Sequence, residues 1–337
     1  MKQPVNSSLQ GCLELFLDRC ESENLSPATI QFYLGNIGRF VRFLADEHNL
    51  ENPSVEDFKA EYIKEYLFMA KSSKKWEAHL QIKTKKEKLS SQSLRTYARA
   101  LRAFGNWLFM EGFIKENILE LVQLPKASKS YKVILDDSEI ETIMKTFNTK
   151  NKLGMRDAII FILAFDCGIR QGGIVNLLIR DVDLKAKTIS VRLKGGDITC
   201  LPIGNTLVKQ IREYKVKYRS LGKENEPLLT NNLGGKLTEN AVKKMFTKLK
   251  KTTGIERINC HLGRHTFATN YMMEGHSQQE LQLALAHESE FMSKNYVHLA
   301  KRATFLIAGA DSHFDKMLIN NKDKKMAIAK VQDKVLQ

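Results

Sequence analysis

Two similar stretches, SPATIQFYLGNIGRFVRFL (residues 26–44) and SSQSLRTYARALRAFGNWL (residues 90–108), decide the fold of the first part of the chain. In both stretches, apolar side chains recur every three or four residues, which is the spacing of one helix face. Each opens with a serine that can cap a helix, and Pro27 suits a first helical turn. We therefore expect two amphipathic helices that pack their aromatic faces into a small helical domain.

Two flanking segments have the same character. Residues 9–20 (LQGCLELFLDRC) and 55–71 (VEDFKAEYIKEYLFMAK) also read as amphipathic helices. The lysine-rich residues 71–88 lie between them and the second repeat, and they fit a solvated connection and a phosphate contact equally well. The expected domain is therefore helical and covers residues 1–124.

Charge points to a polyanionic partner. The 337 residues include 53 Lys and Arg against 38 Asp and Glu, a net charge of +15, which favours nucleic acid. The best-placed cations lie on the polar faces of expected helices, and we take as candidate DNA contacts Arg95, Arg99, Arg102, Lys243 and Lys244.

Apolar runs and cysteine spacing indicate where in the cell the protein is expected. No run approaches 18 consecutive apolar residues, so no membrane span is expected, and the first residues make a poor signal peptide. The five cysteines form no CxxC pair, so reduced thiols are expected rather than disulfides or zinc ligands. We therefore expect a cytoplasmic, nucleoid-associated protein.

A second domain follows a basic connection. Residues 125–134 read as the linker and residues 135–312 as a mixed domain that begins with helices. Within it, TISVRLKGGDITCLPI (residues 188–203) places β-formers on both sides of Lys-Gly-Gly-Asp, which predicts a β-hairpin. Residues 313–337 form a basic tail that could dock on a neighbouring subunit. The fold class is mainly α with a small β-sheet.

Several segments of the second domain carry side chains suited to phosphate chemistry. Arg170 ends an apolar helix in CGIRQGG, and Arg264 follows His261 in HLGRHTFATN. An arginine presents a planar fork of donors to phosphate oxygens. His265 follows Arg264 directly, so we expect it to face elsewhere and to be structural.

Three further side chains complete the set. Lys194 lies at the expected hairpin tip, where it could protonate a leaving oxygen. His287 could donate to a pentavalent phosphorane, and Tyr296 could attack phosphorus if cations and a base activate its oxygen. No carboxylate pair of the kind that holds a metal accompanies them.

The order of these segments resembles the tyrosine recombinase (phage integrase) family over nearly the whole chain. CGIRQGGIVNLLIRDVDL resembles its first-arginine box, ISVRLKGGDITCLPI its lysine hairpin, HLGRHTFATNYMMEG its H-x-x-R box and LALAHESEFMSKNYVH its nucleophile box. SPATIQFY (residues 26–33) and the helix that follows resemble its helical core-binding domain. The resemblance implies six catalytic residues, Arg170, Lys194, His261, Arg264, His287 and Tyr296.

The resemblance also implies a mechanism and an assembly. Tyr296 would attack the scissile phosphate to leave a 3′-phosphotyrosine, without ATP, metal or other cofactor. The two domains would close on double-stranded DNA as a C-shaped clamp. A monomer or weak dimer would form a tetramer on two sites, and an accessory recombination protein could assist. The helical pattern begins within the first ten residues, which predicts the simple two-domain type.

Three positions depart from the family pattern. Gly173 stands where a glutamate is usual, which puts the support of Arg170 in question. Gly263 replaces a common leucine and could loosen its turn, and Asp197 replaces a common basic residue. Two alternatives stay open from sequence: a type IB topoisomerase that relaxes DNA as a monomer, and a catalytically silent DNA-binding architectural protein.

Overall fold

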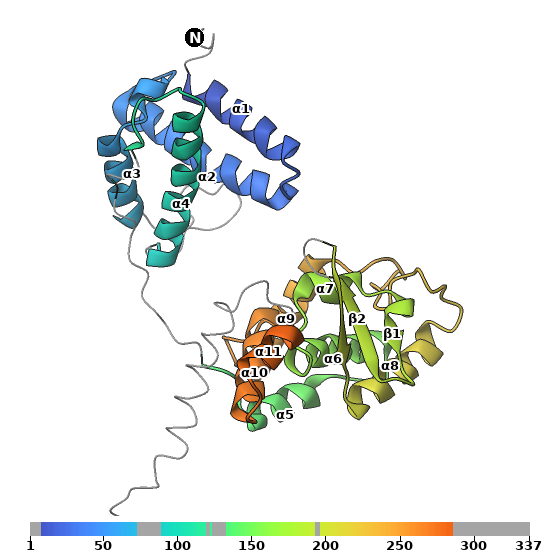
Figure 1. The fold of residues 1–337 in the computed structure, drawn as a ribbon. Coiled ribbons are helices and arrows are strands. Elements are labelled where there is room, and N and C mark those ends of the chain that lie inside the picture. The colour runs from blue at the N-terminus through green and yellow to red at the C-terminus, as the bar shows by residue number, and fades with distance from the viewer. Residues whose placement is uncertain (1–7, 73–88, 119–121, 123–132, 193–195, 286–337) are drawn as a thin grey trace, which may run out of the picture. The chain divides into compact units, whose positions relative to one another are not determined.

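The computed structural model describes residues 8–72, 89–118, 122, 133–192 and 196–285. The chain divides into two compact units, Met1–Ser130 and Tyr131–Gln337, and Figure 1 labels most of their elements. The expected fold class, mainly helical with one small sheet, is confirmed. Within the described residues, no helix is both long enough and apolar enough to cross a membrane.

The first unit is a helical domain built around the two repeated stretches. They form α2 (Pro27–His48) and α4 (Ser91–Met110), and they pack with α1 (Leu9–Ser22), α3 (Ala60–Ser72) and the short 3₁₀ turn η1 (Val55–Asp57). Ser26 and Ser90 cap α2 and α4, since each hydroxyl accepts a backbone N–H three residues ahead.

Aromatic side chains fill the core of this unit. Phe58 makes edge-to-face contacts with both Phe40 and Phe104, at ring-centroid distances of 5.7 and 5.6 Å. Phe16 of α1 meets Phe104 of α4 at 5.5 Å. Such pairs contribute beyond the area that they bury, so the predicted aromatic faces do hold the helices together.

The second unit surrounds one buried helix. Helix α6 (Lys152–Phe165) is buried along nearly its whole length and packs against α8 (Asn205–Tyr218) and α10 (Cys260–Met273). The remaining elements of this unit are α5 (Asp137–Thr146), α7 (Gln171–Asn176), η3 (Ile179–Asp181), α9 (Glu239–Thr253) and α11 (Gln278–Leu285).

A three-stranded antiparallel sheet completes the unit. The expected hairpin is β2 (Thr188–Arg192) paired with β3 (Ile198–Pro202), in a register that sets Ser190 opposite Cys200. A short strand not foreseen from sequence, β1 (Val182–Asp183), extends the sheet on the other side of β2. Ile189 and Val191 face the core, whereas Arg192 is exposed.

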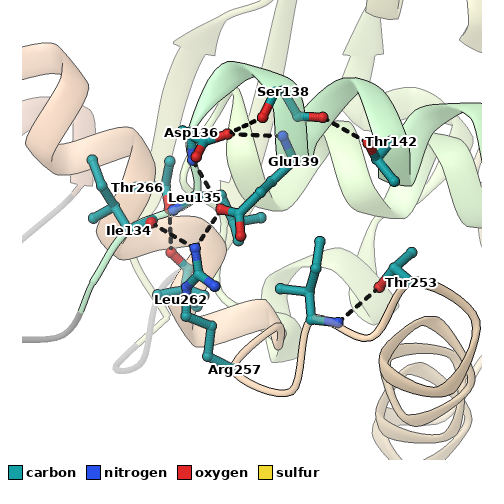
Figure 2. A network of polar contacts seen from close by, with 11 residues as sticks. Ile134, Leu135, Asp136, Ser138, Glu139, Thr142, Thr253, Arg257, Leu262 and Thr266 are labelled. Carbon is teal, nitrogen blue, oxygen red and sulfur yellow. Dashed lines mark hydrogen bonds and ion pairs between the residues drawn. The ribbon is translucent and has the colours of Figure 1, made fainter.

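A polar network joins the start of this unit to helix α10, as Figure 2 shows. Asp136 and Glu139 form a capping box at α5, and Arg257 pairs with Glu139 and donates to the Ile134 carbonyl. The Thr266 hydroxyl of α10 accepts from the Leu135 N–H at 3.3 Å. The segment before α5 is thereby tied to the helix that carries Arg264.

Candidate active site

Arg264 is a buried cation held by two carbonyl groups. Its side chain lies on α10 and is only 6% exposed. Nη1 donates to the Gly168 carbonyl at 2.8 Å, and Nη2 donates to the Leu285 carbonyl at 2.6 Å. A buried charge is costly unless hydrogen bonds satisfy it, so these bonds both stabilise the guanidinium and fix the direction of its fork.

The turn that receives Arg264 requires a glycine. Gly168 has φ +62°, and a Cβ there would lie 2.5 Å from Phe267 Cδ1 and 2.9 Å from Leu285 Cδ2. A left-handed backbone suits glycine, which has no Cβ to clash. The turn after α6 can therefore bring its carbonyl close to α10 and, directly after it, lead into Arg170.

Arg170 lies directly before α7 and lines the same cavity as Arg264. It is the N-cap of this helix and is exposed. A cavity of about 720 Å³ is lined by both arginines and by Gly173, Lys236 and residues of β2 and β3. Two of the predicted catalytic residues, which lie far apart in the sequence, therefore line one cavity.

His261 lies on the first turn of α10 and is exposed, one helical turn from His265. Neither histidine is among the residues that line the cavity, so the structure does not place His261 beside the two arginines, and the contact between His265 and His261 was not expected. Residues four apart share a helix face, and the two Nε2 atoms are 3.1 Å apart with ring centroids 4.5 Å apart. His265 therefore contacts the ring of His261 and restricts its orientation.

The other three predicted catalytic residues, Lys194, His287 and Tyr296, lie outside the described residues. Described residues that are near two of them in the sequence line the cavity. Ile198 and Arg192, on either side of the Lys194 segment, line the cavity, and so does Leu285, which is two residues before His287.

Two glycines that depart from the family pattern are closely packed. A Cβ on Gly263 would lie 2.8 Å from the Phe165 ring, so this glycine lets α10 approach α6 and does not interrupt the helix. A Cβ on Gly173 would lie 2.9 Å from Ile169 Cγ2 and 3.0 Å from Val191 Cγ1. Asp197 is exposed, directly before β3.

Buried thiols beside the site are not candidate nucleophiles. Burial raises the pKa of the Cys260 thiol to about 12, although the Arg264 guanidinium opposes this shift. Burial, with a smaller effect of Asp166, raises the pKa of Cys167 to about 12. Both thiols are therefore protonated at neutral pH, and a thiolate is the reactive form.

The candidate DNA contacts lie on the outer faces of their helices. Arg95 and Arg99 of α4 and Lys243 and Lys244 of α9 are exposed, and Arg102 is half-buried. Sequence reasoning did not single out Lys236, which precedes α9 and lines the cavity with the two arginines. Its only sequence signal is a basic residue before a helix start. Among the described residues, no group of three or more His, Cys, Asp or Glu side chains could hold a metal ion.

Comparison with known proteins assigns the class. Residues 134–303 match the model of the phage integrase family. The chain is 30% identical over 302 residues to "Tyrosine recombinase XerC" of Bacillus pumilus (strain SAFR-032), covering 87% of this chain and 93% of the relative. It is 29% identical over 303 residues to the protein of that name from Bacillus subtilis (strain 168), with the same coverage.

Solved structures share the fold. The Tn1549 transposon integrase in complex with a circular intermediate DNA matches with a TM-score of 0.65 at 20% identity, covering 89% of this chain and 99% of the other. XerH bound to palindromic difH substrate matches at 0.64 and 20%, covering 90% and 84%.

A mainly helical protein with this sheet and these relatives is a DNA strand-transfer enzyme. More specifically, the chain belongs to the phage integrase family and is a site-specific tyrosine recombinase, which cleaves and rejoins DNA.

Proposed function

We propose that this enzyme cleaves DNA through a 3′-phosphotyrosine on Tyr296, with Arg170, Arg264 and His287 stabilising the transition state. His261 assists proton transfer, and Lys194 protonates the leaving 5′ oxygen. The observation that supports this proposal best is the cavity that Arg170 and Arg264 both line. Two arginines that line one cavity suit a phosphorane, whose negative charge is spread over several oxygens.

The chemistry of the cavity needs neither ATP nor a cofactor. In such a reaction the phosphodiester exchanges one oxygen for another, so the phosphotyrosine bond conserves its energy until a 5′ hydroxyl attacks it. The fixed fork of Arg264, anchored by two carbonyls, requires little reorganisation when the charge develops.

The proposed assembly on DNA is supported by a solved structure with the same fold. A lambda integrase dimer bound to a COC′ core site has been solved with a TM-score of 0.64 to this chain at 18% identity, covering 86% of this chain and 77% of the other. For this protein we propose a homo-tetramer on two DNA sites, formed from monomers or weak dimers at the nucleoid in the cytoplasm. Residues 1–124 and 135–312 act as the core-binding and catalytic domains, residues 125–134 as their linker, and residues 313–337 as a tail that docks in trans.

Covalent trapping tests the nucleophile and recovers the target site in one experiment. The wild type and a Tyr296→Phe variant are incubated with fragmented genomic DNA, denatured in detergent, and the attached DNA is sequenced. We expect the wild type to give adducts at a recurring sequence and the variant to give none while binding the recovered site equally well. Equal adduct yields would refute the role of Tyr296, and their absence from both would refute catalysis.

A plasmid-relaxation assay, with the covalent trapping, separates the alternatives. A topoisomerase would relax a supercoiled plasmid that lacks the recovered site, whereas the recombinase requires the site. An architectural protein would bind without any Tyr296-dependent adduct. The exposed cations Arg95, Arg99, Lys243 and Lys244, with the half-buried Arg102, are expected to contribute to binding. Neutralising each should therefore reduce the salt dependence of affinity.

A further inference from the structure

The first turn of α7, which carries Arg170, is weakly held by its own sequence. The helix has six residues, and the side chain of its N-cap, Arg170, makes no capping hydrogen bond. The second and third helical residues are Gly172 and Gly173, and glycine is among the poorest helix formers. Contacts from outside α7 must therefore fix this turn.

Position 173 is the place where a glutamate would ordinarily help. It is the third helical residue, from which a Glu side chain can reach back to the backbone N–H of the N-cap. Here a Cβ at this position would lie 2.9 Å from Ile169 Cγ2 and 3.0 Å from Val191 Cγ1. A glutamate would displace these side chains, so the fold around Gly173 leaves no room for that support.

A contact with helix α9 is present instead. Gln171 Nε2 donates to the Glu239 carbonyl oxygen at 2.7 Å and lies 3.4 Å from Glu239 Oε2. Glu239 Oε1 is 3.4 Å from the point that a Cβ on Gly172 would occupy. Glu239 also lines the same cavity as Arg170. The contact thus places the Glu239 carboxylate and a hydrogen bond beside the first turn of α7, where Gly173 stands in place of the usual glutamate.

Helix α9 is a firm anchor for this contact. The Thr238 hydroxyl caps it by accepting from the Ala241 N–H at 3.2 Å. Its inner face is buried through Val242, Met245, Phe246 and Leu249. Because α9 is fixed in the core, a hydrogen bond to its first residue can hold the first turn of the shorter helix α7 in place.

We propose that Gln171, through its hydrogen bond to Glu239, is a positioning residue for Arg170 and replaces the missing first-box glutamate. This inference rests on the proposed role of Arg170 at the scissile phosphate. Gln171 itself touches no reacting atom. Its loss changes where the guanidinium lies, and small misplacements of a catalytic group are costly in rate.

Single-turnover cleavage of a nicked duplex carrying the recovered site measures the effect. Gln171→Met keeps the side-chain volume but donates no hydrogen bond, and we expect it to form the covalent complex about tenfold more slowly. Asn240→Ala, a change at the next, exposed residue of α9, is the matched control and should cleave at the wild-type rate. Thermal unfolding and DNA affinity of both variants should match the wild type.

Two further measurements distinguish positioning from general damage. In an Arg170→Gln background, Gln171→Met should cause no further loss, because residues that act through one another are not additive. Gln171→Glu should cleave more slowly than Gln171→Met, since it sets a carboxylate against both the Glu239 carbonyl oxygen and the Glu239 carboxylate. Adding Glu239→Gln should then recover part of the rate, because the new amide can donate to the carboxylate introduced at position 171.

The outcomes are separable. A wild-type rate for Gln171→Met, or a loss that multiplies in full with that of Arg170→Gln, would overturn the positioning role while leaving the recombinase mechanism intact. If Arg170→Gln itself cleaved as fast as the wild type, the proposed function of Arg170 would fail first, and the inference with it.

Discussion

Arg264 and Arg170 line one cavity, but the segments that carry them are held in different ways. Arg264 is 6% exposed on a 14-residue helix packed on α6, and two backbone carbonyls grip its guanidinium. Arg170 is exposed at the start of a six-residue helix with two glycines in its first turn. One cation belongs to the core, and the other depends on a contact between two helix ends.

This difference indicates which arginine contributes to the stability of the fold and which contributes to the reaction alone. A change at Arg264 affects the packing of the second unit as well as the proposed chemistry. A change at Arg170 should affect only the chemistry, because its side chain is exposed. Mutations that separate these two properties test the comparison directly.

Arg264→Gln should have the largest effect, because it removes the buried charge and leaves carbonyl groups poorly satisfied. We expect cleavage to fall by at least about 10²–10³-fold and the free energy of unfolding to fall by about 2–4 kcal/mol. Covalent-complex kinetics and urea unfolding measure the two quantities. Arg264→Lys should not restore cleavage, since lysine lacks the fork. An unchanged unfolding free energy would contradict the assignment of Arg264 to the core.

Arg170→Gln should lower the rate of DNA cleavage without lowering the stability of the fold. We expect a loss of about 10²–10³-fold in cleavage with the free energy of unfolding within about 0.5 kcal/mol of the wild type, as for most exposed positions. The same two assays apply. A destabilisation as large as that of Arg264→Gln would show that the two arginines are held alike and would remove the contrast.

Sequence patterns predicted the fold well where periodicity was strong. The repeated stretches gave α2 and α4, and the β-formers around residues 193–197 gave the β2–β3 hairpin. Strand β1 was not foreseen because its two residues carry no periodicity and it exists only through pairing with β2. Local pattern cannot reveal an element that tertiary contact creates.

Some features of the candidate site were predicted from the sequence and others were not. Motif order indicated that Arg170 and Arg264 belong together, and both line one cavity. The contact between His265 and His261 was missed, because the position of His265 beside Arg264 outweighed its four-residue spacing from His261. The Gln171–Glu239 bond could not be predicted, since its partners are remote in sequence and no motif contains both.

Gly263→Ala tests the packing that supports Arg264. Its Cβ would lie 2.8 Å from the Phe165 ring and 3.0 Å from the Ala164 Cβ, so we expect a destabilisation of about 1–3 kcal/mol. The matched control is Gly38→Ala in α2, where nothing lies within 4 Å of the new Cβ. Because alanine is the better helix former, this control should stabilise by up to about 1 kcal/mol. Equal effects of the two changes in urea unfolding would argue against close packing of α10 on α6.

Asp136→Asn should have the smallest effect and a distinctive pH dependence. Asp136 accepts from the Glu139 N–H at 2.9 Å and from the Ser138 hydroxyl at 2.7 Å, within the network that leads to α10. Hydrogen bonds hold the pKa of this carboxyl below its ordinary value; the bond from the Glu139 N–H has the larger effect and the bond from the Ser138 hydroxyl the smaller. A lowered folded-state pKa stabilises the fold above the unfolded pKa of about 3.9, and this contribution is lost as pH falls through the folded pKa.

Asparagine can still cap the helix, so only the charge-dependent part of the stabilisation should disappear in this variant. Urea unfolding at a series of pH values should therefore find Asp136→Asn slightly less stable than the wild type at pH 7, with the difference shrinking below about pH 4. A difference that stays constant as the pH falls well below that value would mean that the carboxylate charge does not contribute. The bracing of the Arg264 helix would then come from the Arg257 and Thr266 contacts alone.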